Sequence, residues 1–417
     1  MSIQKNEHTH GDDAVKAGRR LRVVHLGKFY PPYVGGIETH IQALCGELRK
    51  SLDVRVIVAN DHGPSEEGVV DGVNVSRLRT QCSIAGAPLC ASMAWRIRKA
   101  RADVVHLHLP NPFGIISYLM SGHRGPLVAT WHSDVVRQEL LATAFEPFLQ
   151  RFLKHCLVLI ASSPNYIESS RVLSAVRERC RVIPYGIAAD RFKARDPAAI
   201  DSIRARYGPK IVLTVGRLVY YKGVEYLIDA MAKIDGCLLV VGDGPLRASL
   251  ERRARAIGVA DRVAFIGEVS DCNLASYYQA CDVFVLPSVA RSEAFGIVQL
   301  EAMACGKPVI NTSLASGVPF ASLDGVTGVT VPPGSPAPLA DALTLLLDDE
   351  NLRAKYGRAA LSRVESEFSL DAMVRRTIEV YEKISGRGRI VTGSDQVDKR
   401  SREATAGEAD LETGTEG

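Results

Sequence analysis

The chain has 417 residues, of which 46% are hydrophobic, and a formal net charge of +4 at pH 7. This length exceeds what one hydrophobic core usually supports, so we expect two domains. The small net charge argues against nucleic acid as a partner. Nine scattered cysteines without a Cys-x-x-Cys pair argue against a disulfide framework and a structural zinc site, and indicate a reducing cytosol.

Both ends of the chain are polar. Residues 1–20 lack the apolar segment of a signal peptide, and residues 387–417 show almost no apolar clustering. We expect both segments to be disordered. No uninterrupted apolar run reaches the ~18 residues of a membrane span, so the sequence predicts a cytoplasmic protein with at most a peripheral place at the inner face of the cell membrane.

From Leu21 onward, short β-branched runs alternate with amphipathic segments of helix length, such as 37–50 and 139–154. The strands predicted in this first half are 22–27, 54–59, 73–78, 103–107, 127–130, 157–161 and 181–184. Alternation of strand and helix is typical of a parallel sheet with helices on both faces. We therefore predict a Rossmann-like first domain over residues 21–190.

The pattern then restarts after a polar, alanine-rich linker at 188–201, which we expect to permit hinge motion. The strands predicted in the second half are 211–215, 238–241, 263–266, 283–286, 308–310 and 329–332. A second Rossmann-like domain over residues 202–368 follows from this series. The space between two such domains is the default ligand site.

Basic residues of the first half gather at 95–101, 151–155 and 171–181, and in the first two of these stretches they stand beside an aromatic residue. On amphipathic helices these residues could lie on an anionic membrane surface. A solvated helix face explains them equally well.

Two carboxylates, Glu293 and Glu301, stand eight positions apart around a glycine. On one helix they would be rotated by ~80° and separated by about 12 Å along the axis, so they would not meet. If the helix instead starts near Gly296, its first free N–H groups face an anion, with one carboxylate on each side of that phosphate site. An ordinary strand–loop–helix with a solvated Glu293 and a capping Glu301 is the plain alternative.

Residues 292–310 resemble the Glu-x7-Glu signature of the retaining glycosyltransferases of family 4, because Phe-Gly-Ile lies within the pair and Glu-Ala-Met-Ala-x-Gly-x-Pro-Val-Ile follows it. The resemblance implies the α/β GT-B fold: two Rossmann-like domains with parallel sheets facing across a cleft. It also implies that Glu293 contacts hexose hydroxyls and that Glu301 holds the ribose diol. The phosphate-binding amides implied are those of Phe295, Gly296 and Ile297.

The resemblance covers roughly residues 21–385, and it implies that the last helix, 369–385, crosses back to the first domain. It extends to the loop after strand 211–215, which contains Gly-Arg and Lys-Gly pairs. Arg217 and Lys222 suit a diphosphate at a strand's carboxyl end, because the leaving group gains negative charge as the sugar bond breaks. The alternative is a basic loop that neutralises a helix end. No Asp-x-Asp motif is present, so we expect neither a metal nor another cofactor.

In the first domain, Gly35 and Gly36 lie between a strand and a helix, where backbone can approach a phosphate or an acceptor closely. His132 follows strand 127–130, and the resemblance places a histidine of this loop at the reaction centre. Asp134 would orient His132 or bind the acceptor. His106 and His108 are interpreted as residues at the end of the sheet, and one of them could line the cleft.

The turn 242–245 looks like a dinucleotide-binding turn, but its third glycine is missing, which argues against hydride transfer. By resemblance this loop packs beneath the nucleoside, and the next loop borders the base. Val269 and Asp271 are the base contacts that this reading selects.

The prediction is a retaining hexosyltransferase that uses a nucleotide diphosphate sugar. Thr130 to Gln138, Ser162 to Tyr166 and Val182 to Ile187 resemble bacterial transferases of O-antigen and exopolysaccharide synthesis, which favours mannose from GDP-mannose and a polyprenyl-linked glycan acceptor. A UDP-sugar enzyme of the same fold, a nucleotide-sugar epimerase, and a non-catalytic sugar-nucleotide-binding assembly subunit are the alternatives. A phosphorylase would need a lysine-bound pyridoxal cofactor and a much longer chain.

Overall fold

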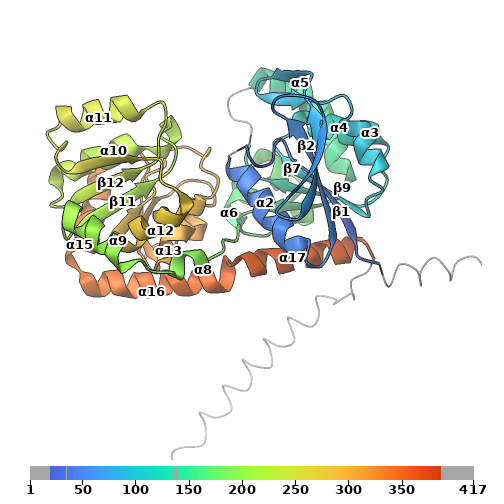
Figure 1. Ribbon diagram of the computed structural model, residues 1–417. Helices are drawn as coiled ribbons and strands as arrows, with labels where there is room; N and C mark the ends of the chain where they lie inside the picture. The colour runs from blue at the N-terminus through green and yellow to red at the C-terminus, as the bar shows by residue number, and fades with distance from the viewer. Residues whose placement is uncertain (1–18, 34, 135–138, 387–417) are drawn as a thin grey trace, which may run out of the picture.

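The computed structural model describes residues 19–33, 35–134 and 139–386. These residues form two lobes side by side (Figure 1), each built on a sheet that has a hydrophobic cluster on either face. The chain thus has two Rossmann-like domains, as the sequence predicts. The segments expected to be disordered lie almost wholly outside the described residues. Arg19, at the edge of one of them, forms an ion pair with Asp103 at 2.8 Å.

The first sheet has the strand order β10-β9-β8-β7-β1-β2-β4-β3, and all of its neighbours are parallel except β3 and β4. Its strands are β1 (Arg22–Leu26), β2 (Asp53–Asn60), β3 (Glu66–Val70), β4 (Val73–Arg79), β7 (Val104–Leu109), β8 (Leu127–Trp131), β9 (Cys156–Ala161) and β10 (Cys180–Val182). The chain winds outward from β1 in one direction and from β7 in the other. The switch point of this sheet therefore lies between β1 and β7.

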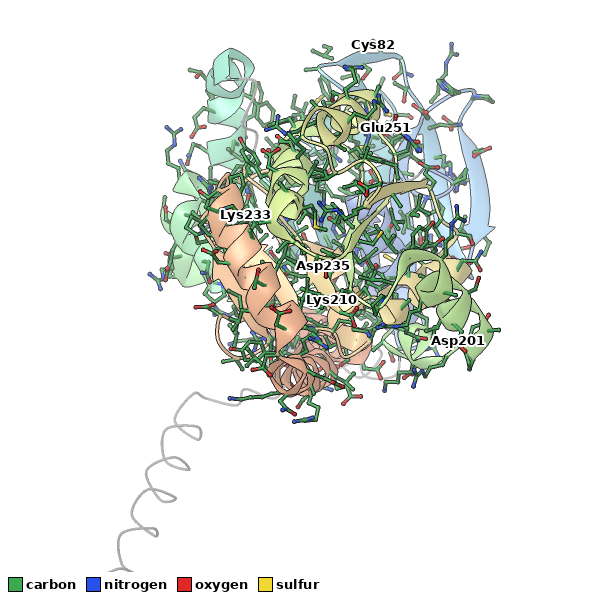
Figure 2. All side chains as sticks on the ribbon, turned by 90° about the vertical axis from the view of Figure 1, so that its left-hand side faces the viewer. Cys82, Asp201, Lys210, Lys233, Asp235 and Glu251 are labelled. Carbon is green, nitrogen blue, oxygen red and sulfur yellow. The ribbon has the colours of Figure 1, made fainter. Side chains whose placement is uncertain are left out.

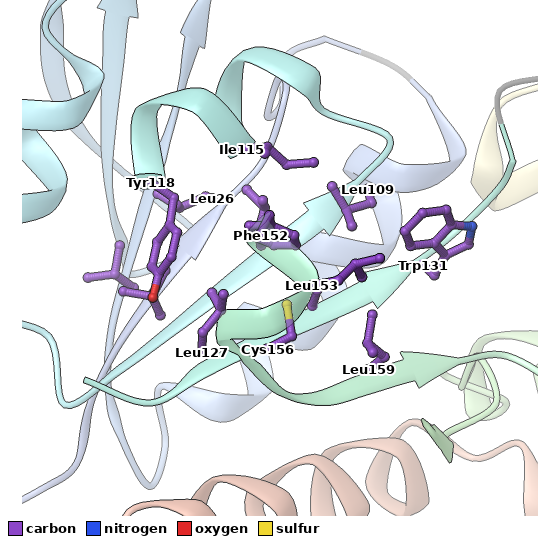
Figure 3. Close-up of a cluster of buried hydrophobic side chains, with 14 of the residues drawn as sticks. Leu26, Leu109, Ile115, Tyr118, Leu127, Trp131, Phe152, Leu153, Cys156 and Leu159 are labelled. Atoms are coloured by element: carbon purple, nitrogen blue, oxygen red, sulfur yellow. The ribbon is translucent and has the colours of Figure 1, made fainter. Parts of the chain in front are cut away.

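Helices cover both faces of the first sheet, and Figure 3 shows Phe152 and Leu153 of one of them packed beside Leu127 and Leu159. The helical segments are α2 (Gly36–Leu48), α3 (Met93–Lys99), α4 (Pro112–Ser121), α5 (Glu139–His155), α6 (Pro164–Ser169), α7 (Arg171–Ser174) and the 3-10 turn η1 (Arg177–Arg179). The apolar periodicity of the sequence predicts the two longest of them, α2 and α5.

Edge strand β3 and the hairpin of β5 (Cys82–Ile84) and β6 (Ala87–Leu89) are absent from the sequence-based prediction. Strands β3 and β5 are largely exposed and β6 has only three residues, so none of them has the apolar pattern of a buried strand. The residues of their turns are the sequence feature that indicates these two hairpins. Asp71-Gly72 and Ala85-Gly86 all have positive φ, between 50° and 77°, which two-residue hairpin turns of type I′ require.

The second sheet has the order β13-β12-β11-β14-β15-β16, all parallel, which is the doubly wound order 3-2-1-4-5-6. Its strands are β11 (Ile211–Val215), β12 (Cys237–Val241), β13 (Val263–Gly267), β14 (Val283–Val285), β15 (Val309–Thr312) and β16 (Gly328–Val331). The switch point lies between β11 and β14. The loops after these two strands are the ones that carry Arg217, Lys222 and Glu293.

The helical segments of the second domain are α9 (Pro197–Tyr207), η2 (Tyr220–Lys222), α10 (Val224–Ala230), η3 (Met231–Lys233), α11 (Arg247–Ala256), α12 (Asp271–Ala280), α13 (Ile297–Ala304), α14 (Val318–Ala321), α15 (Pro336–Asp348) and α16 (Glu350–Glu367). The charged side chains of Asp201, Lys233 and Asp235 lie on the outside of this lobe (Figure 2), where all three are exposed. The polar residues between the apolar runs thus form the surface, as the alternating pattern indicates.

The linker is more ordered than its composition suggested, since residues 188–201 contain α8 (Asp190–Lys193) and the start of α9. Asp196 caps α9 by accepting a hydrogen bond from the Ala199 amide at 3.1 Å, and Pro197 occupies the first turn. Caps and alanines favour helix over coil. The predicted linker thus contains helix, and its hinge motion stays a prediction.

The last helix, α17 (Leu370–Ile384), crosses back to the first domain and lies beneath it beside α2 (Figure 1). The two chain segments that pass from one domain to the other are hydrogen-bonded to each other. The Ile187 amide donates to Phe368 at 2.9 Å, and the Leu370 amide donates to Ile187 at 3.0 Å. At Gly186 an added Cβ would lie 2.6 Å from the Ser369 carbonyl oxygen, so the close approach of these segments requires glycine.

Gly296 offers a test of how the fold shapes the loop after β14. It has φ of 73°, and an added Cβ would lie 2.3 Å from Leu286 Cδ2. We expect Gly296→Ala to lower the free energy of unfolding by roughly 2 kcal/mol, because backbone strain and overpacking add. Gly46, which has open space around it within α2, is the control. Gly46→Ala should change stability by about 1 kcal/mol or less, upward, in urea titrations followed by circular dichroism. Equal effects of the two substitutions would contradict this account.

Candidate active site

The centre of the site is an ion pair between Lys222 and Glu293, whose Nζ and Oε2 atoms are 2.6 Å apart. The two side chains come from the loops after β11 and β14, on opposite sides of the switch point. They are only 13% and 10% exposed, and Ser288 Oγ donates to the same Glu293 oxygen at 3.1 Å. Burial lowers the pKa of the Lys222 ammonium, but the charge and hydrogen bond of Glu293 outweigh burial and hold that pKa above its ordinary value. Lys222 therefore stays charged.

Glycine explains how Lys222 reaches this position. Gly216 has φ of 144°, and an added Cβ there would lie 3.3 Å from Lys222 Nζ. The absence of a side chain at Gly216 therefore lets the Lys222 side chain fold back against the backbone of its own loop. Gly223 has φ of 63°, and its Cβ would lie 2.2 Å from the carbonyl oxygen of Pro287 in the loop that leads to Glu293. The two loops thus touch through backbone as well as through the ion pair.

Arg217 is exposed at the same strand end, and among the described residues it forms no ion pair. Its loop is held by backbone hydrogen bonds: the Gly216 amide donates to Val241 at 2.9 Å, and the Leu218 amide donates to Asp243 at 2.8 Å. A Cβ at Gly244 would lie 2.5 Å from the Leu218 carbonyl oxygen. The glycines of the turn 242–245 therefore support the loop of Arg217, which accounts for them without a dinucleotide.

The helix that the sequence places near Gly296 is α13, with Gly296 as its N-cap residue. Phe295, the residue before Gly296, can offer a ligand only its backbone, because its ring is buried against Tyr185, Phe320 and Phe368. In the first turn of α13 the Gln299 amide donates to the Gly296 carbonyl at 3.0 Å, which leaves the amides of Ile297 and Val298 as the ones without an acceptor earlier in the helix. Together with Arg217 and Lys222 they form an electropositive strand-end site, next to the Glu293 carboxylate.

Glu301, one turn into α13, accepts a hydrogen bond from the Tyr278 hydroxyl at 2.7 Å. Tyr278 is fully buried, and burial together with the adjacent carboxylate raises its pKa well above the ordinary value, so it remains a donor. Val269 is half-buried in the loop after β13, and the Asp271 side chain lies outside what the structure describes. Sequence reasoning missed Tyr278, because only the packing of α12 on α13 brings it to Glu301.

An ion pair joins the two domains beside this site, between Arg291 and Asp134 at 3.2 Å. The other oxygen of Asp134 accepts from Trp131 Nε1 and from Ser170 Oγ, each at 2.9 Å. Arg291 precedes Glu293 by two residues, and Asp134 follows His132 by two. Arg291 is not predicted from sequence, since nothing local indicates a partner in the other domain.

On the first domain, Gly35 is extended and caps α2, which begins at Gly36. A Cβ at Gly35 would lie 2.3 Å from Glu38 Oε2, whereas Gly36 has open space. Burial raises the pKa of Glu38, and a backbone hydrogen bond and the charge of Lys28 partly offset this rise. A buried carboxylate thus stands beside the paired glycines, which the sequence analysis did not note.

His132 is 3% exposed, and both of its ring nitrogens have partners: Nδ1 is 2.7 Å from the Tyr185 hydroxyl, and Nε2 is 3.0 Å from His108 Nδ1. A ring contact with a hexose is therefore not available in this conformation, and the reaction-centre role of His132 stays a prediction. His106 and His108 are 0% and 2% exposed, so they are core residues at the switch point rather than residues lining the ligand site.

The comparisons with known proteins agree with this architecture. A family model described as "Glycosyltransferase Family 4" matches residues 34–191, and one described as "Glycosyl transferases group 1" matches residues 197–363. The D-rhamnosyltransferase WbpZ of Pseudomonas aeruginosa is 35% identical over 353 residues, which cover 84% of this chain and 92% of that protein. O-antigen chain mannosyltransferase C of Escherichia coli is 31% identical over 365 residues, covering 87% and 98%.

Among solved structures, HepE of Anabaena in complex with UDP aligns with a TM-score of 0.72 at 22% identity, covering 87% of this chain and 100% of that one. Two Rossmann-like domains joined by a returning helix define the GT-B class. The chain belongs to the glycosyltransferases, with a family 4 first half and a group 1 second half. Within the described residues, no helix is long and apolar enough to span a bilayer.

The buried histidines of the first domain predict acid lability. Burial lowers the pKa of His25 to about 3 and of His40 to about 4, and it lowers the pKa of His106, His108 and His132 well below the ordinary 6.5. Below pH ~6.5 the unfolded chain binds protons that the folded chain does not, so stability is lost as pH falls toward the folded-state pKa values. Each histidine contributes about 1.4 kcal/mol per pH unit in that window.

We expect urea midpoints to be level from pH 8 to 7 and to fall steeply between about 6.5 and 5. The pH dependence of the unfolding free energy, measured by circular dichroism, should correspond to an uptake of several protons. Stability that is flat over this range would show that the histidines are not held neutral.

Proposed function

We propose that this chain is a retaining hexosyltransferase that moves a sugar from a nucleotide diphosphate donor to an acceptor hydroxyl. The observation that carries the proposal is the Lys222–Glu293 pair at the carboxyl ends of β11 and β14, next to the start of α13. Ligands of open α/β sheets bind at such a switch point. Cations, a helix N-terminus and a carboxylate that meet there suit a diphosphate joined to a hydroxylated ring.

The diphosphate is assigned to Arg217, Lys222 and the amides of Phe295, Gly296 and Ile297. As the glycosidic bond breaks, negative charge develops on the leaving phosphate, and these fixed positive groups stabilise it without reorganising. Lys222 is already charged and held in place by Glu293. On this assignment the leaving phosphate takes the acceptor's proton, and neither glutamate acts as a nucleophile.

Glu293 is assigned to hexose hydroxyls and Glu301 to the ribose diol. Tyr278 supports the second assignment, because its hydrogen bond fixes one Glu301 oxygen. Val269 and Asp271 are assigned to the base. Gly35 and Gly36 are assigned to the distal phosphate or the acceptor, on the first domain.

The donor assigned is GDP-mannose, and the acceptor is a polyprenyl-linked glycan of surface polysaccharide synthesis. The names of two relatives, a D-rhamnosyltransferase and an O-antigen chain mannosyltransferase, favour a hexose or deoxyhexose of this kind. The solved structure of HepE holds UDP, which keeps a UDP-sugar as the second candidate. A non-catalytic subunit is disfavoured because Arg217, Lys222, Glu293 and Glu301 are all present.

A donor panel tests the proposal directly. Purified protein is incubated with GDP-mannose, UDP-glucose or UDP-N-acetylglucosamine, with and without polyprenyl-linked acceptors, and in the presence or absence of EDTA. Turnover of one donor that survives EDTA supports the proposal, and retention is read from the anomeric configuration of the product by NMR. Tight nucleotide binding without turnover of any donor would favour the non-catalytic subunit.

Substitutions in the ion-pair site should separate turnover from binding. We expect Glu293→Gln to lower kcat by about 100-fold, because its carboxylate is assigned to the sugar. Nucleotide affinity should change little, because the glutamine amide oxygen can still accept a hydrogen bond from Lys222. Arg217→Ala should weaken nucleotide diphosphate binding by about tenfold or more and lower turnover as well, since a charge-assisted contact is lost. Arg252→Ala, exposed on α11, is the control for loss of a surface arginine. Equal, small effects of the first two substitutions would remove this site from consideration.

The first domain is also assigned a peripheral contact with an anionic membrane, which would bring a lipid-linked acceptor to the site. Trp95 on α3 is 57% exposed, and with Arg98, Lys99 and Arg101 it lines one hollow of the surface. Lys99 Nζ lies 4.8 Å from the centre of the Trp95 indole. Basic residues around an exposed tryptophan suit the headgroup region.

Vesicle flotation tests this contact. We expect the full chain to bind phosphatidylglycerol vesicles more weakly as salt increases, and not to bind neutral phosphatidylcholine vesicles. Arg98→Glu with Lys99→Glu should reduce binding by about tenfold or more, while Arg252→Glu on the second domain should not. Binding that ignores lipid charge or the α3 substitutions would count against the assignment.

A further inference from the structure

One face of the first sheet carries an unusual set of buried polar rings at its switch point. His25 of β1 is the register partner of His106 in β7, and His108 of β7 is the partner of Thr130 in β8. All of these side chains are at most 5% exposed. Tyr381 reaches them from the returning helix α17, and Tyr185 reaches His132 from the first crossing between the domains.

These groups form one continuous chain of hydrogen bonds. Tyr185 Oη is 2.7 Å from His132 Nδ1, and His132 Nε2 is 3.0 Å from His108 Nδ1. His108 Nε2 is 3.0 Å from His25 Nδ1, and His25 Nε2 is 3.3 Å from Tyr381 Oη. Tyr381 Oη is 2.5 Å from His106 Nδ1, and His106 Nε2 is 2.7 Å from Thr130 Oγ1. Both ring nitrogens of each of the four histidines are thus used.

The proton count restricts this chain to two states. A neutral imidazole has one N–H and one bare nitrogen, so it donates to one neighbour and accepts from the other. If every link holds a proton and Tyr381 donates within the chain, all four histidines carry hydrogen on Nε2, or all four carry it on Nδ1. In the first state Thr130 accepts from His106, so the Thr130 hydroxyl proton is not used in the chain. In the second state Tyr185 accepts from His132, and the Tyr185 hydroxyl proton is the one not used.

A metal ion is the competing reading, since His25, His106 and His108 form one triad of ring nitrogens within 4.8 Å, and His40, His108 and His132 form another. A divalent ion would have to replace several of the links above. No carboxylate belongs to either triad, so its charge would lie buried without compensation. The hydrogen-bonded chain uses the same atoms with no buried charge, and we favour it for that reason.

We propose that this chain is a positioning device, in which Tyr381 of the returning helix acts through His25 and His108 to fix the ring and tautomer of His132 and the hydroxyl of Tyr185. Tyr185 contacts Phe295, the residue before the α13 N-cap, with ring centroids 5.2 Å apart. The chain therefore connects α17 to the border between the two domains at the donor site. This inference rests on the proposed transfer reaction.

The test uses the full-length chain with Tyr381→Phe, which removes the hydroxyl shared by His25 and His106. We expect kcat to fall by about tenfold, because Tyr185 packs on Phe295, whose amide is assigned to the leaving diphosphate, and a small misplacement of such a group is costly. KM and nucleotide affinity should change by no more than about twofold. Tyr118→Phe, also buried in the first domain but outside the chain, should leave kcat unchanged. His108→Gln, which can still donate and accept, should retain more activity than His108→Leu.

Nitrogen-15 NMR of the histidine rings provides a readout that does not depend on activity. The wild type should show four neutral imidazoles of one tautomer from pH 6 to 8, and Tyr381→Phe should mix the tautomers as far as His132. Mixed tautomers in the wild type, stoichiometric metal by mass spectrometry, or a kcat loss no larger than that of Tyr118→Phe would overturn the proposal. If the wild type transfers no sugar, the positioning role falls with the proposed function, and the NMR result alone decides whether the ordered chain exists.

Discussion

The Lys222–Glu293 ion pair is the interaction on which the second domain's site depends. It ties the loops after β11 and β14 across the switch point, where the helices that follow these two neighbouring strands pass to opposite faces of the sheet. A charged pair that is about nine-tenths buried would be costly on its own. Ser288 satisfies the carboxylate further, and the glycines at 216 and 223 let the backbone close around the pair. The loop geometry and the charge arrangement therefore require each other.

The first domain treats its switch point in the opposite way. Where the second domain holds a cation and an anion, the first holds imidazoles that burial keeps neutral, linked nitrogen to nitrogen between β1, β7 and the loop after β8. Neutral donors and acceptors avoid the desolvation cost of ions and still fix orientation. Two of the three hydroxyls in this network, those of Tyr185 and Tyr381, come from the two segments that pass between the domains. Those segments are themselves bonded at Ile187 and Leu370, so the network and the domain junction form one connected unit.

Most of the buried framework could be predicted from sequence, because β-branched runs and amphipathic helices alternate with few exceptions. The start of α13 at Gly296 is confirmed, since the spacing of Glu293 and Glu301 made sense only around a helix start. Strand β3 was missed because its exposed Glu-Glu-Gly-Val-Val gives no buried pattern. The helices in the linker were not predicted, although Asp196 followed by Pro197 is a good helix start.

The residues of the site could be predicted from sequence more readily than the side chains that contact them. Tyr278, Arg291 and Tyr381 act on residues 23, 157 and 275 or more positions away, and no local pattern specifies such a contact. The alternating Val-His-Leu-His run of β7 is instructive, because period-two alternation of this kind normally places polar side chains on the solvent face of a strand. In a doubly wound sheet both faces are covered, so the polar face must find partners inside the protein. Histidines that alternate in such a strand therefore indicate an internal hydrogen-bond network. Here the returning helix supplies Tyr381, whose hydroxyl joins His25 to His106.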